Sequence, residues 1–206
     1  MIIKNINISI LAVIFISILI LFLAFVSMLG KNIFYGEGQS LEESMEWQSE
    51  HYDTSFYNGL QKEEFTVKSY DSYVLHGEIL KNPSPSSKYV IISHGHYDTR
   101  YGSLKYASIY LSLGYNCIIY DLRGHGANRR TFCSYSVREG KDLAEIVHFF
   151  QAKLGRNAEI GLHGESLGAA TTIASLKDVQ NISFAVADCG FSDIENVLEE
   201  IWRYSH

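Results

Sequence analysis

Hydrophobic residues fill the first thirty positions almost without interruption. No charged residue occurs between Asn5 and Gly30, and the run is dominated by Ile, Leu, Val and Phe. A helix that crosses a bilayer core of about 30 Å needs about 20 apolar residues. The pattern therefore predicts that residues 1–30 form an N-terminal membrane anchor.

A cleaved secretory signal peptide is the main alternative for this segment. Its apolar region would span about 7–15 residues and end in small residues, whereas this run is longer and Ala24-Phe25-Val26 is a poor cleavage site. A buried helix of a soluble protein fits less well, because every face of the segment is apolar. Lys4 precedes the run, and acidic residues follow Lys31. This modest asymmetry favours a single-pass cell-membrane protein whose soluble domain is extracytoplasmic.

After the anchor, the pattern becomes polar and then alternates between strand-like and helix-like stretches. Residues 31–62 are polar and acidic and are predicted to be a spacer and entry segment, with a short helix from Glu42 to Glu50. Residues 63–206 form the predicted globular domain. Its first two strands are expected to make a hairpin that turns at Asp71-Ser72. These strands cover residues 65–69 and 73–80.

Four short apolar runs rich in β-branched residues suit strands buried on both faces of a parallel sheet. They alternate with stretches in which apolar residues recur every three or four positions, as in amphipathic helices. This alternation predicts βαβ units, in which ligands bind at the carboxyl ends of the strands. The predicted strands cover residues 89–93, 117–120, 160–162 and 182–187, and the predicted helices begin near Leu104, Val137, Ser166 and Ile194.

The composition narrows the class of protein. The 206 residues carry 17 Lys and Arg against 23 Asp and Glu, a net charge of −6, and 47% of them are hydrophobic. So much apolar sequence argues against intrinsic disorder. The acidic balance argues against nucleic-acid binding, which needs clustered positive charge. Three cysteines without metal-ligand spacing give no disulfide framework and are interpreted as small buried hydrophobes. They are Cys117, Cys133 and Cys189.

The first loop with candidate chemistry follows the strand predicted at residues 160–162. There Gly164, Ser166 and Gly168 match the pattern G-x-S-x-G. At a strand-to-helix junction this pattern forms a sharp turn that exposes the serine, and the glycines are needed where backbone segments approach closely. The helix amino terminus behind Ser166 also favours developing negative charge. A glycine- and serine-rich helix start in another kind of α/β protein is the alternative.

The second loop follows the first predicted parallel strand and reads His94-Gly95-His96-Tyr97. Gly95 lets the backbone turn so that an amide can face the serine. An oxyanion hole needs two donors about 3 Å from the oxygen that becomes charged. The amides of His96 and Leu167 are the predicted pair, with the amide of Tyr97 as the fallback. His-x-His alone is weak evidence for a metal pair, and neither a metal nor an organic cofactor is predicted.

The third loop, Asp121-Leu-Arg123-Gly-His125-Gly, follows the strand at residues 117–120. It lacks the G-x-x-x-x-G-K-[ST] order of a phosphate-binding loop. We expect a rigid loop held by an ion pair between Asp121 and Arg123, with His125 shaping the wall of the pocket.

In this order, the three loops resemble those of the α/β-hydrolase superfamily over roughly residues 63–203. The chain looks most like the bacterial membrane-anchored hydrolases of the serine-aminopeptidase and lysophospholipase-like branch. The resemblance implies a mostly parallel sheet with helices on both faces. It also implies that Ser166 is the nucleophile, and that the amides of His96 and Leu167 form the oxyanion hole. Substrates would be acyl esters, amides or short peptides.

The resemblance further implies a carboxylate and then a histidine after the serine, because that is the chain order of this superfamily. The only histidine after Ser166 is His206, which would have to fold back from the last predicted helix. Asp188 and Asp193 are the acids that could line the site. The chain is therefore predicted to be truncated at its carboxyl end and to miss its last strands. The strand at residues 182–187 would then be an exposed apolar edge.

These observations predict a membrane-anchored serine hydrolase that forms an acyl-enzyme but is inactive at this length, because the histidine of the triad is absent. The expected partners are a small acyl substrate and the lipid bilayer. A catalytically silent, membrane-tethered binding or scaffold module is the alternative. A cytosolic dinucleotide-binding protein is disfavoured, because no G-x-G-x-x-G follows the first parallel strand.

Overall fold

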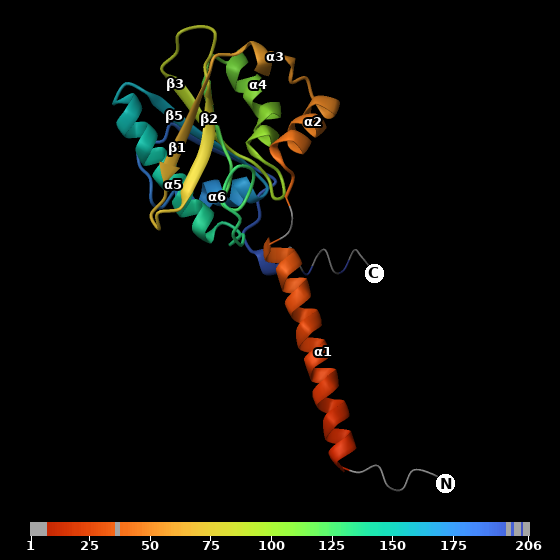
Figure 1. The fold of residues 1–206 in the computed structure, drawn as a ribbon. Helices are drawn as coiled ribbons and strands as arrows, with labels where there is room; N and C mark the ends of the chain where they lie inside the picture. Colours follow the sequence, from red (N-terminus) through yellow and green to blue (C-terminus); the bar gives the residue numbers. More distant parts are fainter. Residues whose placement is uncertain (1–7, 36–37, 197–198, 200–202, 204–206) are drawn as a thin grey trace. The chain divides into compact units, whose positions relative to one another are not determined.

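The structure, a computed structural model, describes residues 8–35, 38–196, 199 and 203 (Figure 1). The chain divides into two compact units, Met1–Glu37 and Gly38–His206. The described part of the first unit is one helix. The second unit contains a β-sheet with helices packed on both of its faces.

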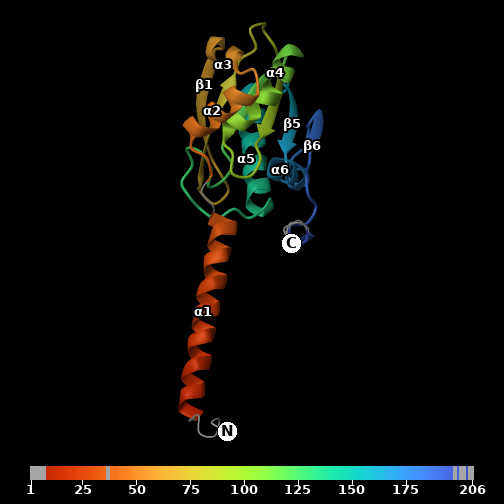
Figure 2. The same ribbon diagram turned by 90° about the vertical axis from the view of Figure 1, so that its right-hand side faces the viewer.

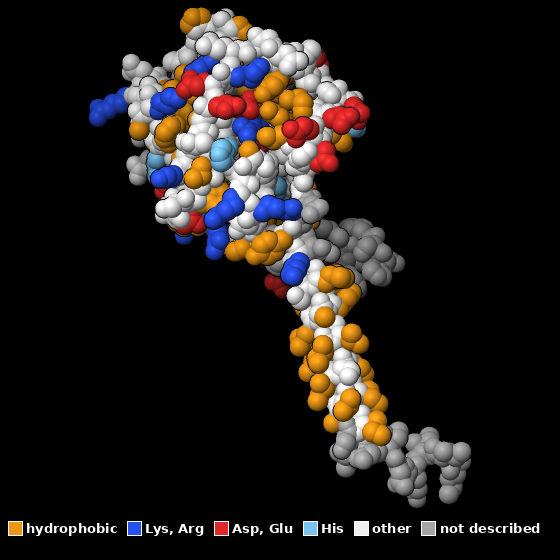
Figure 3. Space-filling model, in the orientation of Figure 1, with side chains coloured by type: hydrophobic (Ala, Val, Ile, Leu, Met, Phe, Trp, Pro, Cys, Tyr) orange, Lys and Arg blue, Asp and Glu red, His pale blue; other side chains and the backbone are white. Residues whose placement is uncertain are grey.

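Helix α1 (Ile8–Tyr35) carries the long apolar run. Its segment Ile10–Lys31 is long and apolar enough to cross a membrane, and no part of its most apolar stretch is buried against protein. Figure 3 shows hydrophobic side chains along the visible length of this helix. An exposed apolar helix next to the amino terminus is typical of a signal anchor or a signal peptide.

Helix α2 (Leu41–His51) begins at a capping box. The Ser40 hydroxyl accepts a hydrogen bond from the Glu43 amide, and the Glu43 carboxylate accepts one from the Ser40 amide. This reciprocal pair satisfies two amides that a helix start otherwise leaves without partners. The helix predicted over residues 42–50 is therefore present in the structure.

Residues 38–61, which lie within the segment predicted to be a spacer and entry segment, belong to the same compact unit as the sheet. Ser44 and Gln48 on α2 are fully buried, and the short helix α3 (Ser55–Gly59) packs Phe56 and Tyr57 against the core. The hydrophobic pattern did not predict this packing because the two buried residues of α2 are polar.

One six-stranded sheet, in the order β1-β2-β4-β3-β5-β6, forms the centre of the second unit. Strand β2 runs antiparallel to both of its neighbours, whereas β4, β3, β5 and β6 are parallel. This arrangement confirms the predicted α/β fold and the predicted hairpin. The strands are β1 (Lys62–Lys68), β2 (Val74–Leu80), β3 (Lys88–Ser93), β4 (Asn116–Tyr120), β5 (Glu159–Glu165) and β6 (Phe184–Asp188).

The connections between the parallel strands decide where a site can form. The chain leaves β3 for β4 on one side and then returns past β3 to β5 on the other side. Loops that leave two adjacent strands in opposite directions open a crevice at the carboxyl ends of those strands. The ends of β3 and β5 are therefore the expected site. The connecting helices are α4 (Leu104–Ser112), α5 (Val137–Leu154) and α6 (Leu167–Ser175), with a short 3-10 helix, η1 (Arg100–Ser103), before α4.

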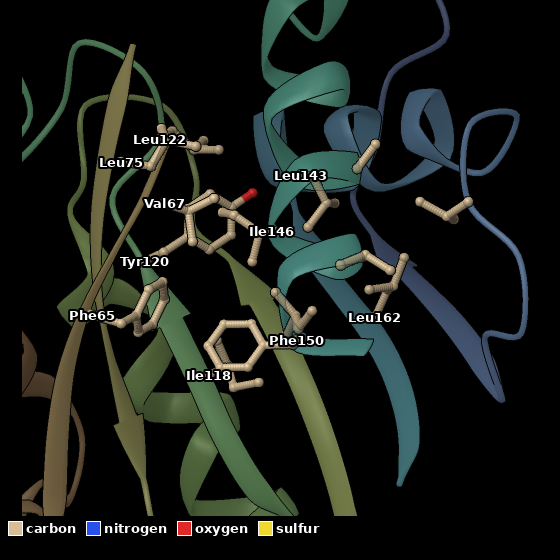
Figure 4. Close-up of a cluster of buried hydrophobic side chains, with 14 of the residues drawn as sticks. Phe65, Val67, Leu75, Ile118, Tyr120, Leu122, Leu143, Ile146, Phe150 and Leu162 are labelled. Atoms are coloured by element: carbon tan, nitrogen blue, oxygen red, sulfur yellow. The ribbon is translucent and has the colours of Figure 1, made fainter. Parts of the chain in front are cut away.

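Two hydrophobic layers hold the sheet between its helices. On one face, Phe150, Ile146 and Leu143 of α5 meet side chains of the strands, among them Phe65 and Ile118 (Figure 4). On the other face, α4 and α3 cover a second cluster. That cluster contains Leu80, Val90, Ile92, Leu104, Ala107, Cys117 and Ile119.

Strand β6 is the last strand of the sheet and lies at the opposite edge from β1 (Figure 2). Among the described strands it pairs with β5 alone, and its Val186 side chain is 38% exposed. The exposed apolar edge that the sequence predicts is therefore present among the described residues. Residues 194–196 of the last predicted helix are helical, but most of that helix and His206 lie outside the described residues.

The ion pair predicted between Asp121 and Arg123 is wrong, because each of these residues has another partner. The Arg123 guanidinium is 2% exposed and binds Asp142 through Nε at 2.8 Å and Nη2 at 2.6 Å. It also binds Asp71 through Nη1 at 2.7 Å. A bidentate contact of this kind satisfies the donors of a buried guanidinium. Arg123 therefore joins the β1–β2 turn to helix α5.

Asp121 is fully buried and forms its ion pair with Arg100, at 3.0 Å between Nη2 and Oδ2. The amides of Arg100 and Ala127 also donate to its carboxylate, at 2.8 and 3.0 Å. The loop after β4 is therefore held by Arg100, which is distant in the sequence, and by the amide of Ala127 within the loop.

Replacing Arg123 by methionine should destabilise the protein by about 3–5 kcal/mol, because the Asp142 carboxylate would stay buried without its partner. Urea unfolding of the detergent-solubilised chain measures this loss. Arg156→Met is the matched control, because Arg156 is exposed, and should change the free energy of unfolding by less than about 0.5 kcal/mol. Equal losses in the two variants would contradict a structural role for Arg123.

Candidate active site

Ser166 is the single residue between strand β5 and helix α6. Its backbone has φ 52° and ψ −111°, a strained conformation that costs about 1–3 kcal/mol and persists only where neighbouring structure holds it. The Ser166 amide donates to the Asp188 carbonyl oxygen at 2.8 Å, and the Ser166 carbonyl accepts from the Ala170 amide at 3.1 Å. A strained turn of this kind presents a serine above the carboxyl edge of a sheet.

Gly164 and Gly168 leave no room for a side chain. A Cβ atom on Gly164 would lie 2.0 Å from the Gly168 carbonyl oxygen. A Cβ atom on Gly168 would lie 2.1 Å from the carbonyl oxygen of Ser93 at the end of β3. Both obstacles are backbone atoms, which cannot move aside without distorting the sheet or helix α6. The two glycines therefore let β3, β5 and α6 meet at one point.

The loop after β3 lies beside the serine. A Cβ atom on Gly95 would be 3.9 Å from the Cβ atom of Ser166. His94 is buried, and its Nε2 accepts the Leu122 amide at 2.9 Å while its Nδ1 lies 2.7 Å from the Gly95 carbonyl oxygen. His94 therefore links the loops after β3 and β4 and holds the backbone that leads to His96.

The structure brings together the two segments that carry the predicted oxyanion donors. Leu167 directly follows Ser166 as the first residue of α6 and is fully buried. His96 is the residue after Gly95, and its ring packs on Tyr97 and Tyr135 with centroid distances of 4.0 and 5.3 Å. Tyr97, the fallback donor, has φ 64° and an exposed side chain.

Three histidine rings lie close together next to this loop. The rings of His94 and His96 are 5.4 and 5.6 Å from that of His125. Burial and the neighbouring His125 lower the pKa of His96 to about 4 and that of His94 to about 3. Burial lowers the pKa of His125 as well. The three rings are therefore neutral at neutral pH. Among the described residues, no group of three or more His, Cys, Asp or Glu side chains is arranged to hold a metal ion.

Two neighbouring residues of α4 bind the acidic residues that end β5 and β6. The Lys105 ammonium donates to the Glu165 carboxylate at 2.6 Å, and the Tyr106 hydroxyl donates to the Asp188 carboxylate at 2.6 Å. The hydrogen bond from Tyr106 lowers the pKa of Asp188. Asp188, which the sequence identifies as a possible site acid, therefore has a hydroxyl partner close to the strained serine.

Several predicted pocket residues lie in the scaffold. Asp121 and Arg123 are buried in the ion pairs described above, and His125 is 7% exposed with its Nδ1 2.9 Å from the Arg123 carbonyl oxygen. Cys117 and Cys133 are buried, as predicted, but Cys189 is exposed, which corrects its interpretation as a buried hydrophobe. Cys189 directly follows β6, the edge strand.

Asp98 is a residue beside the site that sequence reasoning missed. Its carboxylate accepts hydrogen bonds from the Ser44 hydroxyl and from the Thr99 amide, each at 2.7 Å. No local motif marks this contact, because Ser44 and Asp98 are far apart in the sequence. The capping box S-x-x-E at Ser40–Glu43 was the one available signal, and it predicts only where α2 begins.

The neutral histidines should make the protein less stable in acid. A histidine has a pKa of about 6.5 in the unfolded chain, whereas that of His96 in the folded chain is about 4. Between these values the unfolded state binds a proton that the folded state does not, so stability is complete above about pH 6.5 and is lost as the pH falls toward 4. Urea midpoints measured from pH 7 to 4 should therefore fall.

His96→Gln should reduce this acid dependence, whereas His51→Gln, at an exposed histidine of α2, should leave it unchanged. The stability curve is measured for all three proteins over the same pH range. A wild-type midpoint that stays constant between pH 6.5 and 4.5 would contradict the lowered pKa values.

Comparison with known proteins gives the same fold. The chain is 33% identical to YqkD of Bacillus subtilis (strain 168) over 142 residues, which are 68% of this chain and 46% of YqkD. The esterase Pf2001 of Pyrococcus furiosus superposes with TM-scores of 0.59 and 0.63 in two crystal forms, at 27% and 24% identity. Those alignments cover 66% and 73% of this chain and 53% and 57% of the esterase. The chain thus spans about half the length of these relatives.

A cold-adapted esterase from an Arctic intertidal metagenomic library shows the same fold at 21% identity and a TM-score of 0.52, covering 69% of this chain and 65% of that one. The family described as X-Pro dipeptidyl-peptidase (S15 family) matches residues 57–201. That range contains all six strands, the G-x-S-x-G turn and the loop after β3. The α/β-hydrolase fold expected from the sequence is confirmed, and the chain belongs to the X-Pro dipeptidyl-peptidase (S15) family of serine hydrolases.

Proposed function

We propose that this chain carries the nucleophile and oxyanion hole of a membrane-tethered serine hydrolase. Ser166 attacks the carbonyl carbon of an acyl ester, amide or short peptide and forms an acyl-enzyme, which water then hydrolyses. The amides of Leu167 and His96 donate hydrogen bonds to the oxyanion of the tetrahedral intermediate. The chemistry of this proposal needs no cofactor.

The observation that carries the proposal is the strained backbone of Ser166 at the junction of β5 and α6. Such a conformation costs free energy and has no structural purpose that a glycine would not meet at lower cost. A serine that stays in this conformation, with its Cβ atom 3.9 Å from the place that a Cβ on Gly95 would occupy, is explained by a need to expose its hydroxyl to a substrate.

The general base is not found among the described residues around Ser166. No described residue forms a hydrogen bond with the Ser166 hydroxyl, and the nearby histidines His94, His96 and His125 precede the serine in the sequence. The matched relatives extend over about twice the aligned length. We therefore expect the 206-residue chain to be inactive by itself and the base to come from sequence equivalent to the remainder of those relatives.

A fluorophosphonate probe tests the nucleophile directly, because it phosphonylates an activated serine. The protein that carries this sequence at its native length should react at Ser166, with the label lost in Ser166→Ala. The isolated 206-residue chain should react at least about 10³-fold more slowly, because a serine without its base loses most of its nucleophilicity. Mass spectrometry of the labelled peptide identifies the modified residue.

Ser175→Ala is the matched control, because Ser175 lies on the same helix and is buried, and it should leave labelling intact. Rapid labelling of the isolated chain at Ser166 would contradict the expected inactivity of this length. No labelling of the native-length protein would favour the alternative, a catalytically silent binding module. That alternative is supported by the absence of a base next to Ser166 among the described residues.

The tether and its orientation are part of the proposal and have their own test. Helix α1 should hold the protein in the membrane fraction through an alkaline carbonate wash, and protease added to bacterial spheroplasts should digest residues 38–206. The positive-inside rule and the exposed apolar helix support this orientation. Release by the wash would instead indicate a cleaved signal peptide, and protection from protease would reverse the orientation. A cytoplasmic marker protein controls for lysis.

A further inference from the structure

The segment that precedes the sheet touches the loop after β3 at consecutive positions. The Gln39 amide donates to the Tyr97 carbonyl oxygen at 2.8 Å. A Cβ atom on Gly38 would lie 3.2 Å from the same oxygen. Gly38 is also the first residue of the compact unit, and two residues separate it from the end of α1. The start of the domain is therefore in direct contact with the backbone that follows His96.

Helix α2 adds a second set of contacts, to the next residue of the same loop. The Ser44 hydroxyl donates to Asp98 Oδ1 at 2.7 Å, and the Gln48 side-chain amide lies 3.5 Å from Asp98 Oδ2. Both α2 residues are fully buried. Most buried polar side chains have a hydrogen-bond partner, and the Asp98 carboxylate is the partner that the structure gives to Ser44.

Asp98 also accepts from the Thr99 amide at 2.7 Å, and a Cβ atom on Gly102 would lie 2.1 Å from its Oδ2. Its carboxylate is thus held between α2 and the short helix η1 (Arg100–Ser103). A carboxylate confined from two sides fixes the backbone that carries it. The end of the loop is therefore set by α2 and not by the loop alone.

Tyr97, between His96 and Asp98, needs such support. Its φ of 64° is uncommon for a residue with a large side chain and costs free energy. If the contacts of its carbonyl oxygen and of Asp98 were lost, Tyr97 would relax toward negative φ. The peptide group on its amino-terminal side, which belongs to His96 and Tyr97, would rotate with it.

We propose that Ser44 and Asp98 are positioning residues for the oxyanion hole: the hydrogen bond between them holds the strained Tyr97 turn, and through it the backbone of the adjoining His96, whose amide is the proposed donor. The inference rests on the proposed function, because it assigns a catalytic consequence to that amide. It also gives helix α2 a role in positioning the site.

The test compares Ser44→Ala with Ser49→Ala in the native-length protein. Ser49 lies on the exposed face of the same helix, where its hydroxyl bonds only to the Glu46 carbonyl oxygen. Ser44→Ala should lower kcat for a p-nitrophenyl ester about tenfold with KM unchanged, because an oxyanion donor acts in the transition state and not on bound substrate. Fluorophosphonate labelling should slow by a similar factor. Ser49→Ala should change neither.

Two further measurements separate positioning from general destabilisation. Deuterium exchange of the peptide covering residues 94–103 should rise in Ser44→Ala and not in Ser49→Ala, with the urea midpoint recorded for both. In a double-mutant cycle, Ser44→Ala should cause no additional loss of kcat in an Asp98→Ala background, because both changes remove the same contact.

The outcomes distinguish this inference from the proposed function. If the wild-type protein reacts at Ser166 but Ser44→Ala keeps its kcat and labelling rate, the positioning role is overturned and the hydrolase assignment stands. Equal losses in Ser44→Ala and Ser49→Ala would also overturn it, since they would indicate destabilised α2. If the wild-type protein does not react at all, the catalytic consequence fails together with the proposed function, while the exchange data still report whether α2 holds the loop.

Discussion

The close approach of three backbones at Gly164 and Gly168 is the constraint on which the rest of the site depends. Because neither position has room for a Cβ atom, α6 lies directly against the carboxyl end of β3 while it continues β5. The loops after β3 and β5 are consequently held side by side. The order of the sheet, with β3 between β4 and β5, directs the connections that follow β3 and β5 to opposite sides of this point, which is where α/β sheets commonly bind ligands. A side chain at either glycine would push the two loops apart, even though it would leave the chemical groups of the loops unchanged.

Most of the fold was predictable because its strands and helices have recognisable local sequence patterns. Burial of residues that are close in the sequence produces these patterns: apolar runs in β3, β4 and β5, and apolar residues at every third or fourth position in α5. The G-x-S-x-G turn was predictable for the same reason, since its geometry is set within five residues. The pairing of Asp121 was not predictable. Two arginines, Arg100 and Arg123, were available to it, and the choice depended on how the η1 and α5 segments pack against β4, which no local pattern encodes.

The close packing of α2 on the domain could not be predicted from the sequence, and the cause is physical. The most buried residues of the packed face of α2 are Ser44 and Gln48, whereas Met45 on that face is only partly buried, so the hydrophobic pattern is weak. Polar burial is tolerated because Asp98 supplies a hydrogen-bond acceptor. Residues of this kind can be identified only when their partner is known. The same reasoning explains why Cys189, at the edge strand, could not be distinguished by sequence from its two buried counterparts.

Strained residues occur on both sides of the proposed site, and each is held by a segment outside its own loop. Ser166 depends on the Asp188 carbonyl at the end of β6, and Tyr97 depends on Gln39 at the start of the domain. Each positive φ costs about 1–3 kcal/mol when its residue is not glycine, so the free energy that keeps these turns in place must come from the contacts of those outer segments. The geometry between the proposed nucleophile and the proposed oxyanion donors therefore depends on the contacts made by the edge strand β6 and by the segment that begins the domain. Changes in either segment are expected to alter this geometry before they unfold the sheet.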